Sequence, residues 1–357
     1  MPGSIMRIVR AARCRPGVAA VLLAAAVASS IGLAAAVWAE PTRPRVGEGV
    51  TRFTIQTRPI TSFDNRDATR VRFGKLEFRG GIELRTDYKE FGGISGLQLE
   101  ADNQHFLGLS DRGRWFRGRI TYDGKTPKGI ADAEMAPILG ADGTPLARRG
   151  WYDTEALARD GNTAYVGIER VDRIVKFDYG RHGVAARGHA IATPADFKGF
   201  PYNKSLECLV AMPHGGPLGG ALITVLERAL DAAGNLRGFI LGGKQPGEFS
   251  VVRSDDFDVS DCALMPDGDL LLLERRFSIL RGVAMRIRRI PIAAIRPGAT
   301  VDGAQLVFAD MAYQVDNMEG LSVNRTVDGE TMLTLISDDN FSSIQRTILL
   351  QFTLVPE

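Results

Sequence analysis

The sequence predicts an all-β protein that folds as a six-bladed β-propeller, with five or seven blades as the alternatives. Two observations predict it. A short motif recurs five times at intervals of 52 to 60 residues, and each copy is followed by short apolar runs of strand character separated by turn residues. The chain also has 40 glycines in 357 residues and few long helical patterns, which favours many short strands and turns.

The first 39 residues are typical of a secretory signal peptide. Four arginines between residues 7 and 15 precede an apolar stretch from Val18 to Val37, and Val37-Trp38-Ala39 supplies small residues for cleavage after Ala39. We therefore expect a periplasmic or secreted protein in which residues 40–357 form a single domain. The alternative is that the apolar stretch is kept as a membrane anchor. No later segment is apolar enough to span a bilayer.

Composition and charge exclude several classes of protein. The 44 basic and 42 acidic residues and the 45% hydrophobic content exclude a disordered tail, a collagen-like rod and a disulfide scaffold. After loss of the signal peptide the chain carries 40 basic and 42 acidic residues, so its net charge is −2. It therefore lacks the basic footprint of a nucleic-acid-binding protein. We expect a monomer.

The five motif copies begin with a small or acidic residue and open an apolar run. They read Ser95-Gly96-Leu97, Glu155-Ala156-Leu157, Glu207-Cys208-Leu209, Asp261-Cys262-Ala263 and Glu319-Gly320-Leu321. The third and fourth copies continue into Met-Pro-x-Gly turns. A second apolar run then ends in charged residues, and a third run with period-two alternation often follows. Each copy therefore predicts several strands over about 55 residues, the size of a propeller blade.

The remaining strands complete the predicted ring of blades. Five units account for about residues 90–357. Residues 50–90 supply strands for a sixth blade, which we expect to be closed by the C-terminal strand Thr347–Leu354. A β-sandwich with chance internal similarity is the alternative.

The repeated first residue is the main candidate for function. In a propeller the first strand of each blade lies beside the central channel, so Ser95, Glu155, Glu207, Asp261 and Glu319 are expected to converge at one mouth. Two carboxylates about 5 Å apart repel by roughly 3 kcal/mol at an effective dielectric constant near 20. Such a ring needs protons, arginine or a cation, and its oxygen ligands suit Ca²⁺. The alternative is a structural ring whose carboxylates accept backbone N–H groups.

Other residue types were weighed against the same geometry. Arg170 and Arg228 follow second strands beside Glu169 and Glu227, with which they are expected to pair, whereas Arg112 lacks that glutamate and is the better anion-binding candidate. The four histidines are scattered and none has zinc-ligand spacing. Ser95 has no histidine placed to activate it as a nucleophile. The chain contains no G-x-S-x-G, Walker A or G-x-G-x-x-G motif.

The two cysteines of the mature chain occupy equivalent positions in consecutive motif copies. Side chains at equivalent positions should point the same way round the ring. We therefore expect Cys208 and Cys262 to be small buried residues that do not form a disulfide.

The motifs in this order resemble a known family, the secreted bacterial phytase-like domain described as esterase-like activity of phytase. The resemblance spans about residues 80–355. It is carried by Ile94-Ser95-Gly96-Leu97, Leu109-Ser110-Asp111-Arg112-Gly113, Asp153-Thr154-Glu155-Ala156-Leu157, Asn203-Lys204-Ser205-Leu206-Glu207, Asn317-Met318-Glu319-Gly320-Leu321 and Ser337-Asp338-Asp339-Asn340-Phe341. The resemblance implies a β-propeller and metal-assisted hydrolysis of phosphate or other esters. The charge of −2 and the absence of a lysine cluster argue against phytate as the substrate.

The sequence and the resemblance together predict an exported hydrolase that acts on a small anionic ester, with phosphoesters as the first expected substrate class. Glu155 and Glu319 are the expected catalytic carboxylates, and Arg112 is expected to hold the anion. The expected Ca²⁺ ligands are Glu155, Glu207, Asp261, Glu319, Asp338, Asp339 and Asn340. The alternatives are a non-catalytic ligand-binding or scaffold propeller and a calcium-dependent lactonase, for which no base could be placed.

Overall fold

The computed structural model describes residues 49–216 and 218–355, which belong to one compact unit spanning Arg45–Glu357. The expected signal peptide, with its cleavage point after Ala39, lies outside the described residues. Within the described part of the chain, no helix has both the length and the apolar character needed to cross a bilayer.

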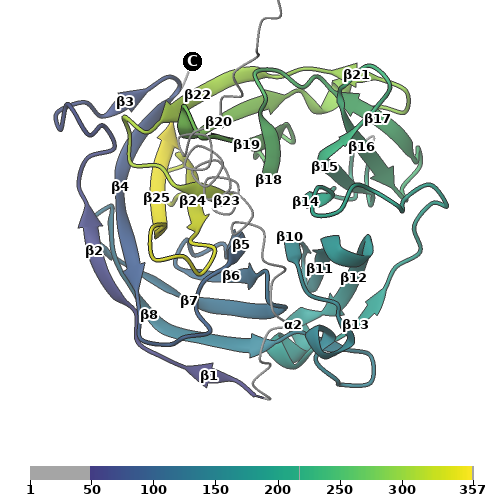
Figure 1. The fold of residues 1–357 in the computed structure, drawn as a ribbon, viewed down its shortest axis with the longest axis horizontal. Coiled ribbons are helices and arrows are strands. Elements are labelled where there is room, and N and C mark those ends of the chain that lie inside the picture. The colour runs from purple at the N-terminus through teal and green to yellow at the C-terminus, as the bar shows by residue number, and fades with distance from the viewer. Residues whose placement is uncertain (1–48, 217, 356–357) are drawn as a thin grey trace, which may run out of the picture. The chain divides into compact units, whose positions relative to one another are not determined.

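Five sheets, in which most neighbouring strands run antiparallel, are arranged around a central axis (Figure 1). From the axis outward, blade 1 contains β5 (Ile94–Leu99), β6 (His105–Ser110), β7 (Arg114–Asp123), β8 (Thr126–Pro137) and β1 (Thr51–Arg52). Blade 2 contains β10 (Thr154–Asp160), β11 (Thr163–Ile168), β12 (Arg173–Asp178), β13 (Arg187–Ala190) and β9 (Leu139–Gly140). Blade 3 contains β14 (Leu206–Ala211), β15 (Leu222–Leu230), β16 (Leu236–Leu241), β17 (Gly247–Val251) and β21 (Thr300–Val301).

The last two blades complete the ring. Blade 4 contains β18 (Asp258–Leu264), β19 (Leu270–Ser278), β20 (Gly282–Ile290) and β22 (Ala304–Asp310). Blade 5 contains β23 (Asn317–Arg325), β24 (Thr331–Asp338), β25 (Thr347–Leu354), β4 (Leu76–Arg85) and β2 (Gln56–Ile60), and β3 (Arg72–Phe73) pairs with β4. The helical segments are short: η1 (Leu146–Arg149), η2 (Glu169–Val171), α2 (Tyr179–His182), η3 (Gly183–Ala185) and η4 (Ile292–Ala294). The all-β propeller prediction is confirmed.

The prediction of a sixth blade is wrong for the described chain, which forms five. The N-terminal strands do meet the C-terminal strand as expected, with Leu350 of β25 opposite Gly81 of β4. They add to the sheet that already contains β23 and β24, however, and do not form a sheet of their own. Gly81 permits this closure, because a Cβ there would lie 2.6 Å from Leu350 Cδ2 and 2.8 Å from the Leu349 carbonyl oxygen.

The core lies between neighbouring blades. Along β19, Leu271 and Leu273 pack into the cluster shared with blade 5, whereas Leu270 and Leu272 pack into the cluster shared with blade 3. Side chains of a strand alternate between its two faces, so a strand buried on both faces reads as a continuous apolar run. Burial on both faces explains why the period-two signal is weak in the inner strands.

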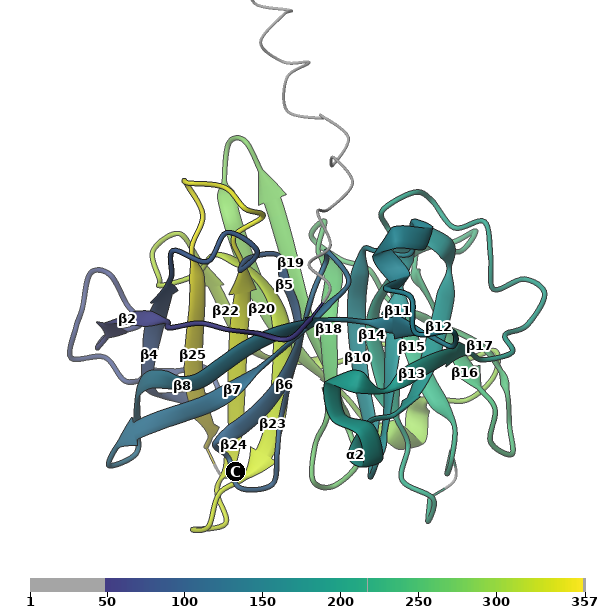
Figure 2. The same cartoon turned by 90° about the horizontal axis from the view of Figure 1, so that it is seen from below.

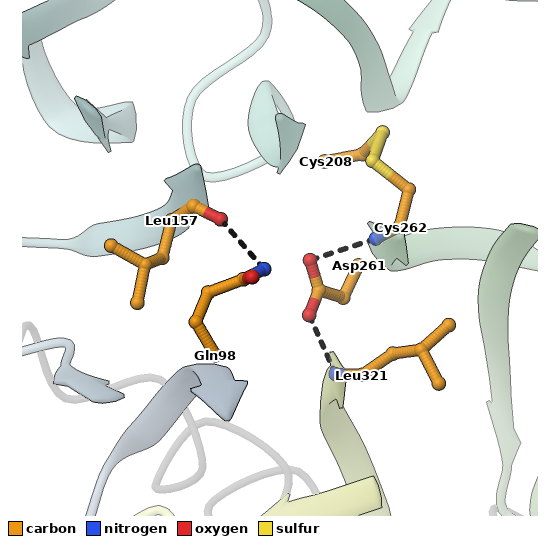
Figure 3. The surroundings of a disulfide bond; sticks show 6 residues. All are labelled: Gln98, Leu157, Cys208, Asp261, Cys262 and Leu321. Atoms are coloured by element: carbon orange, nitrogen blue, oxygen red, sulfur yellow. Dashed lines mark hydrogen bonds between the residues drawn. A yellow bond between two sulfur atoms is a disulfide. The ribbon is translucent and has the colours of Figure 1, made fainter. Parts of the chain in front are cut away.

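The two cysteines form a disulfide, so the prediction that they do not pair is wrong. Cys208 and Cys262 lie on β14 and β18, the innermost strands of adjacent blades, with Cα atoms 5.0 Å apart (Figure 3). The prediction assumed equivalent positions. The strand register shows that Cys208 corresponds to Asp261, and that Cys262 is one residue further along its strand. A shift of one residue turns a side chain to the opposite face of a strand, which is why the two sulfur atoms can meet.

Candidate functional site

A β-bulge at the start of each innermost strand positions the first layer of the site. The pairing of the first and second strands skips one residue in every blade. A bulged residue is left out of the strand ladder and its side chain is re-aimed. The bulged residues are Ser95, Glu155, Glu207, Ser260 and Glu319.

The sequence alignment of the fourth copy was therefore wrong by one residue, because Ser260 and not Asp261 is its bulged residue. The carboxylate of Asp261 is 2% exposed and accepts the N–H of Leu321 at 2.6 Å and that of Cys262 at 2.7 Å (Figure 3). Asp261 thus connects blade 4 to blade 5 through backbone hydrogen bonds. Burial is the main cause that raises its pKa well above the ordinary value.

The second layer comes from the ends of the second strands. In each blade, the residue just before the bulge pairs with a residue of the second strand. The second layer consists of the residue that follows this partner in the second strand. By this register the equivalent residues are Asp111, Glu169, Glu227, Arg275 and Asp338. Four are carboxylates, and the fourth blade supplies an arginine in their place. We call the end of the propeller where these two layers meet the site pole.

The carboxylates of both layers interact as one group, called here the acidic cluster: Asp111, Glu155, Glu169, Glu207, Glu227, Glu319 and Asp338. Burial raises the pKa of Glu155 well above its ordinary value, and Glu207 and Glu319 raise it further. Burial likewise raises the pKa of Asp111 to about 7 and that of Glu169 to about 8. The cluster therefore holds protons near neutral pH unless a cation displaces them.

Arg275 is the cation of this pole. Its Nη2 lies 3.2 Å from Glu319, 3.5 Å from Glu227 and 3.9 Å from Glu207. Burial alone lowers the pKa of Arg275, but these three carboxylates raise it above the ordinary value. Arg275 lies within 3.9 Å of three of the seven carboxylates of the acidic cluster, so protons or another cation are needed to neutralise the rest of the charge.

Three glutamates of the cluster come close enough to share a cation. One carboxylate oxygen from each of Glu169, Glu207 and Glu227 lies within 4.8 Å of the other two, and all three side chains are buried. We call them the glutamate triad. Glu169 also accepts the N–H of Ser205, whereas Oε2 of Glu207 is buried with no hydrogen-bond partner in the described chain. An unpaired buried carboxylate oxygen is costly, which favours a ligand at this point.

The sequence identified Glu207 as a metal ligand. It predicted that Glu169 and Glu227 pair with Arg170 and Arg228 instead. Those pairs do not form. Arg228 pairs with Asp258 through Nε at 2.7 Å. Arg170 stacks on Tyr152, with its guanidinium carbon 4.4 Å from the ring centre, and donates to the Tyr202 hydroxyl at 2.9 Å. Glu169 follows Ile168 of β11, and Glu227 follows Leu226 of β15 at the equivalent position. This repeated glutamate was the sequence signal that could have identified the triad.

Glu155 and Glu319 occupy different environments in the cluster. Glu155 is 8% exposed, and its carboxylate forms no hydrogen bond or ion pair with any described residue. Glu319 is held in place, since it accepts the Asn317 side-chain amide at 2.7 Å and pairs with Arg275. Burial raises the pKa of Glu319 above the ordinary value, although Arg275 and Asn317 oppose the shift.

The residues after Asp338 form the turn that supports the mouth of blade 5. Oδ1 of Asp339 accepts the N–H of Gly93 at 3.2 Å and that of Phe341 at 3.0 Å. Asn340 and Phe341 have positive φ angles of 48° and 50°. The Arg112 guanidinium stacks on the Phe341 ring, and its central carbon lies 3.2 Å from the ring centre. Arg112 forms no ion pair with any described carboxylate.

The remaining candidates of the sequence analysis lie outside the acidic cluster. Ser95 donates through Oγ to the Thr154 carbonyl oxygen at 2.5 Å, which ties blade 1 to blade 2. His105 contacts Asp102 at 2.5 Å and His214 lies 3.4 Å from Asp160. His182 and His189 line an open cavity of about 580 Å³ on the outer side of blade 2.

The fold and the acidic pole are those of a β-propeller with an oxygen-rich centre. A family model described as Phytase-like, esterase-like activity of phytase, matches residues 89–341. The chain belongs to this family, which confirms the resemblance found in the sequence and indicates a protein of the ester-hydrolase type. No curated protein matches the chain.

Several solved structures are similar to the chain at low identity. An endo-arabinase from Bacteroides thetaiotaomicron VPI-5482 has a TM-score of 0.41 and 12% identity, over 75% of this chain and 96% of that one. A glutaminyl cyclase from Myxococcus xanthus has a TM-score of 0.39 and 11% identity, over 87% and 100%. The dihydro-heme d1 dehydrogenase NirN in complex with DHE has a TM-score of 0.35 and 13% identity, over 91% and 84%. Nothing about the site is inferred from these similarities.

Proposed function

We propose that this protein is an exported, metal-assisted hydrolase of small anionic esters, with phosphoesters as the leading substrate class, and that its reaction takes place at the acidic cluster. The observation that carries the proposal is the buried glutamate triad with its unpartnered Glu207 oxygen. Membership of the phytase-like family supports ester hydrolysis as the type of reaction.

The triad fits a hard divalent cation. Ca²⁺ binds six to eight oxygens at 2.3–2.6 Å, so oxygens on opposite sides of one ion lie up to about 5 Å apart. The mutual distances of the triad oxygens are within 4.8 Å, and all are carboxylate oxygens without nitrogen or sulfur donors. Glu169, Glu207 and Glu227 would hold the ion. When bound, Ca²⁺ supplies Lewis-acid polarisation of the ester and of a water molecule.

This ligand set differs from the one expected from the sequence. Glu207 is common to both. Asp261 is left out of the proposal because both of its carboxylate oxygens accept backbone N–H groups, and Asp339 and Asn340 because they belong to the supporting turn. Asp338 stays as a member of the acidic cluster beside Glu319.

The chain's own residues supply the remaining roles. Glu155 is the proposed general base, because its carboxylate has no hydrogen-bond or ion-pair partner among the described residues and because burial raises its pKa above the ordinary value. Glu319 orients the site through Arg275 and Asn317. Arg112 is the proposed anion-binding group, since its guanidinium stacks on Phe341 and forms no ion pair with any described carboxylate, although Asp111 lies next to it in sequence.

The test is turnover of p-nitrophenyl phosphate and p-nitrophenyl acetate by the purified exported protein, with Ca²⁺ or with EDTA. We expect Ca²⁺-dependent hydrolysis, and a loss of at least about 100-fold in kcat for Glu155→Gln and Glu319→Gln with melting curves retained. Glu248→Gln, which alters an outer-strand pair with Arg237, is the matched control and should keep full activity. Full activity in both cluster variants would contradict the proposed roles.

A non-catalytic propeller with a structural carboxylate group is the second candidate. It is favoured by Arg275, which already neutralises part of the cluster without a metal. No turnover of either ester together with no Ca²⁺-dependent change in melting temperature would leave this candidate in place of the hydrolase.

A further inference from the structure

Three strongly exposed apolar side chains lie close together in sequence at the tip of the β19–β20 hairpin. Phe277 is 70% exposed, Ile279 93% and Leu280 97%. The strands stay paired up to Ser278 and Gly282, and the Arg281 N–H donates to the Ser278 hydroxyl at 3.0 Å. The apolar residues are therefore presented by a tight hydrogen-bonded turn. Monomeric soluble domains rarely expose such a group without an interaction that covers it.

The hairpin is an extension on the site pole. In blade 4 the second strand continues three residues past Arg275 before it turns, as β15 continues three residues past Glu227 in blade 3, whereas β11 ends at Ile168 and β24 at Asp338. Figure 2 shows the β19–β20 hairpin rising at the end of the body where these neighbouring strands end. Whatever covers the tip therefore also faces the acidic cluster.

Other exposed apolar side chains lie at this pole. Tyr202 lies in the loop before β14, Met311 in the loop before β23, and Ile344 in the turn after β24, and these side chains are 62%, 59% and 89% exposed. Met311 adjoins the base of the hairpin, since a Cβ at Gly282 would lie 2.7 Å from its Cγ. These side chains come from separate blades, which suits an extended planar partner better than a compact one.

The charges around the tip are basic. The sequence from Arg275 to Val301 contains no acidic residue. Arg281 lies in the tip itself, and Arg276 precedes it. The exposed carboxylates of the neighbouring loop are already paired, Asp255 with Arg286 at 3.6 Å and Asp256 with Arg253 at 3.6 Å. Arginine at the base of an exposed apolar tip complements anionic lipid head groups above an acyl layer.

From these observations we propose that the β19–β20 hairpin is a lipid-surface anchor: Phe277, Ile279 and Leu280 enter the interfacial layer of an anionic bilayer, Arg281 contacts its phosphate groups, and the site pole faces the membrane. The inference concerns where the protein binds and does not depend on the hydrolase proposal.

The test places a tryptophan at the tip. Leu280→Trp and the control Val327→Trp, which lies in the β23–β24 turn at the opposite pole and is fully exposed, are compared with the unchanged exported protein. Each is mixed with vesicles of phosphatidylcholine and phosphatidylglycerol that carry brominated acyl chains, which quench tryptophan only at the depth of the bilayer. We expect quenching of Leu280→Trp above the level of the unchanged protein and none in Val327→Trp. This readout is independent of any other attachment to the vesicle.

Two further variants, made in the Leu280→Trp background, test the chemistry. Ile279→Ser should weaken the vesicle-dependent quenching by about tenfold in lipid concentration, since it removes a side chain worth roughly 1.5 kcal/mol or more when fully buried. Arg281→Gln should weaken it by about fivefold with phosphatidylglycerol present and leave it unchanged with phosphatidylcholine alone. Equal quenching at positions 280 and 327 would overturn the proposal. So would self-association that Ile279→Ser abolishes in the absence of lipid-dependent quenching, because the tip would then be a protein interface.

Discussion

Glu207 brings an uncompensated charge into the centre of the acidic cluster. One oxygen lacks a partner and the other is 3.9 Å from Arg275, while Glu169 and Glu227 lie beside it. Without a cation, Glu207→Gln should therefore stabilise the protein at pH 8, by up to the roughly 3 kcal/mol of repulsion expected for two carboxylates about 5 Å apart. Urea unfolding in EDTA measures this change. A destabilised Glu207→Gln protein would show that the charge is needed for folding.

Asp111 makes the cation-free protein sensitive to pH. Burial raises its folded-state pKa to about 7, and Asp153 and Glu319 raise it further although Arg112 opposes the shift, whereas the unfolded chain ionises near 3.8. Between these values the folded state binds more protons than the unfolded state, so stability is highest at low pH and is lost as pH rises toward 7. In EDTA the melting temperature should be higher at pH 5 than at pH 8, and Asp111→Asn should flatten the difference.

Asp261 is expected to act through stability. Asp261→Ala leaves the N–H groups of Leu321 and Cys262 without their acceptor in a buried place, which should cost about 1–3 kcal/mol or more. Urea unfolding measures the loss, and the Ca²⁺-dependent melting shift should persist. Loss of that shift in a folded Asp261→Ala protein would return Asp261 to the ligand set.

At the scale of the strand, the bulges explain both what the sequence predicted and what it missed. The first residue of the motif, serine or glutamate, identified the bulged residue of the innermost strand in four blades. In the fourth copy Asp261-Cys262 resembled Glu207-Cys208, but the bulge falls at Ser260. A spacing in sequence cannot show which residue leaves the strand ladder, and a one-residue error reverses the face of every side chain that follows.

The same one-residue shift makes the disulfide between β14 and β18 possible. It joins adjacent blades across 54 residues, a separation for which a native disulfide contributes about 2–4 kcal/mol. Cys208→Ser/Cys262→Ser should lower the urea midpoint accordingly, and a reductant should lower the unchanged protein to the same value. If the reductant has no effect on the unchanged protein, the bond does not form in solution.

At the scale of the whole molecule, the repeat in the sequence predicted a propeller but miscounted its blades. Residues 50–90 have strand patterns of their own, and sequence alone gives no measure of where they pair. In this segment β4 pairs with β25 of blade 5, and β1 pairs with β8 as an outer strand of blade 1. The last blade needs strands from both ends of the chain to complete the ring. The second layer of carboxylates was also missed, since it forms only when the ends of five second strands converge.

The central claim is that carboxylates from separate blades form one cation site at one pole. Calorimetric titration of the purified protein with Ca²⁺ after removal of metals by EDTA tests it most directly. We predict saturable binding that is lost in Glu169→Gln/Glu227→Gln and kept in the outer-strand control Glu248→Gln. Absence of Ca²⁺ binding, or equal binding by the protein without the two triad glutamates, would contradict the account.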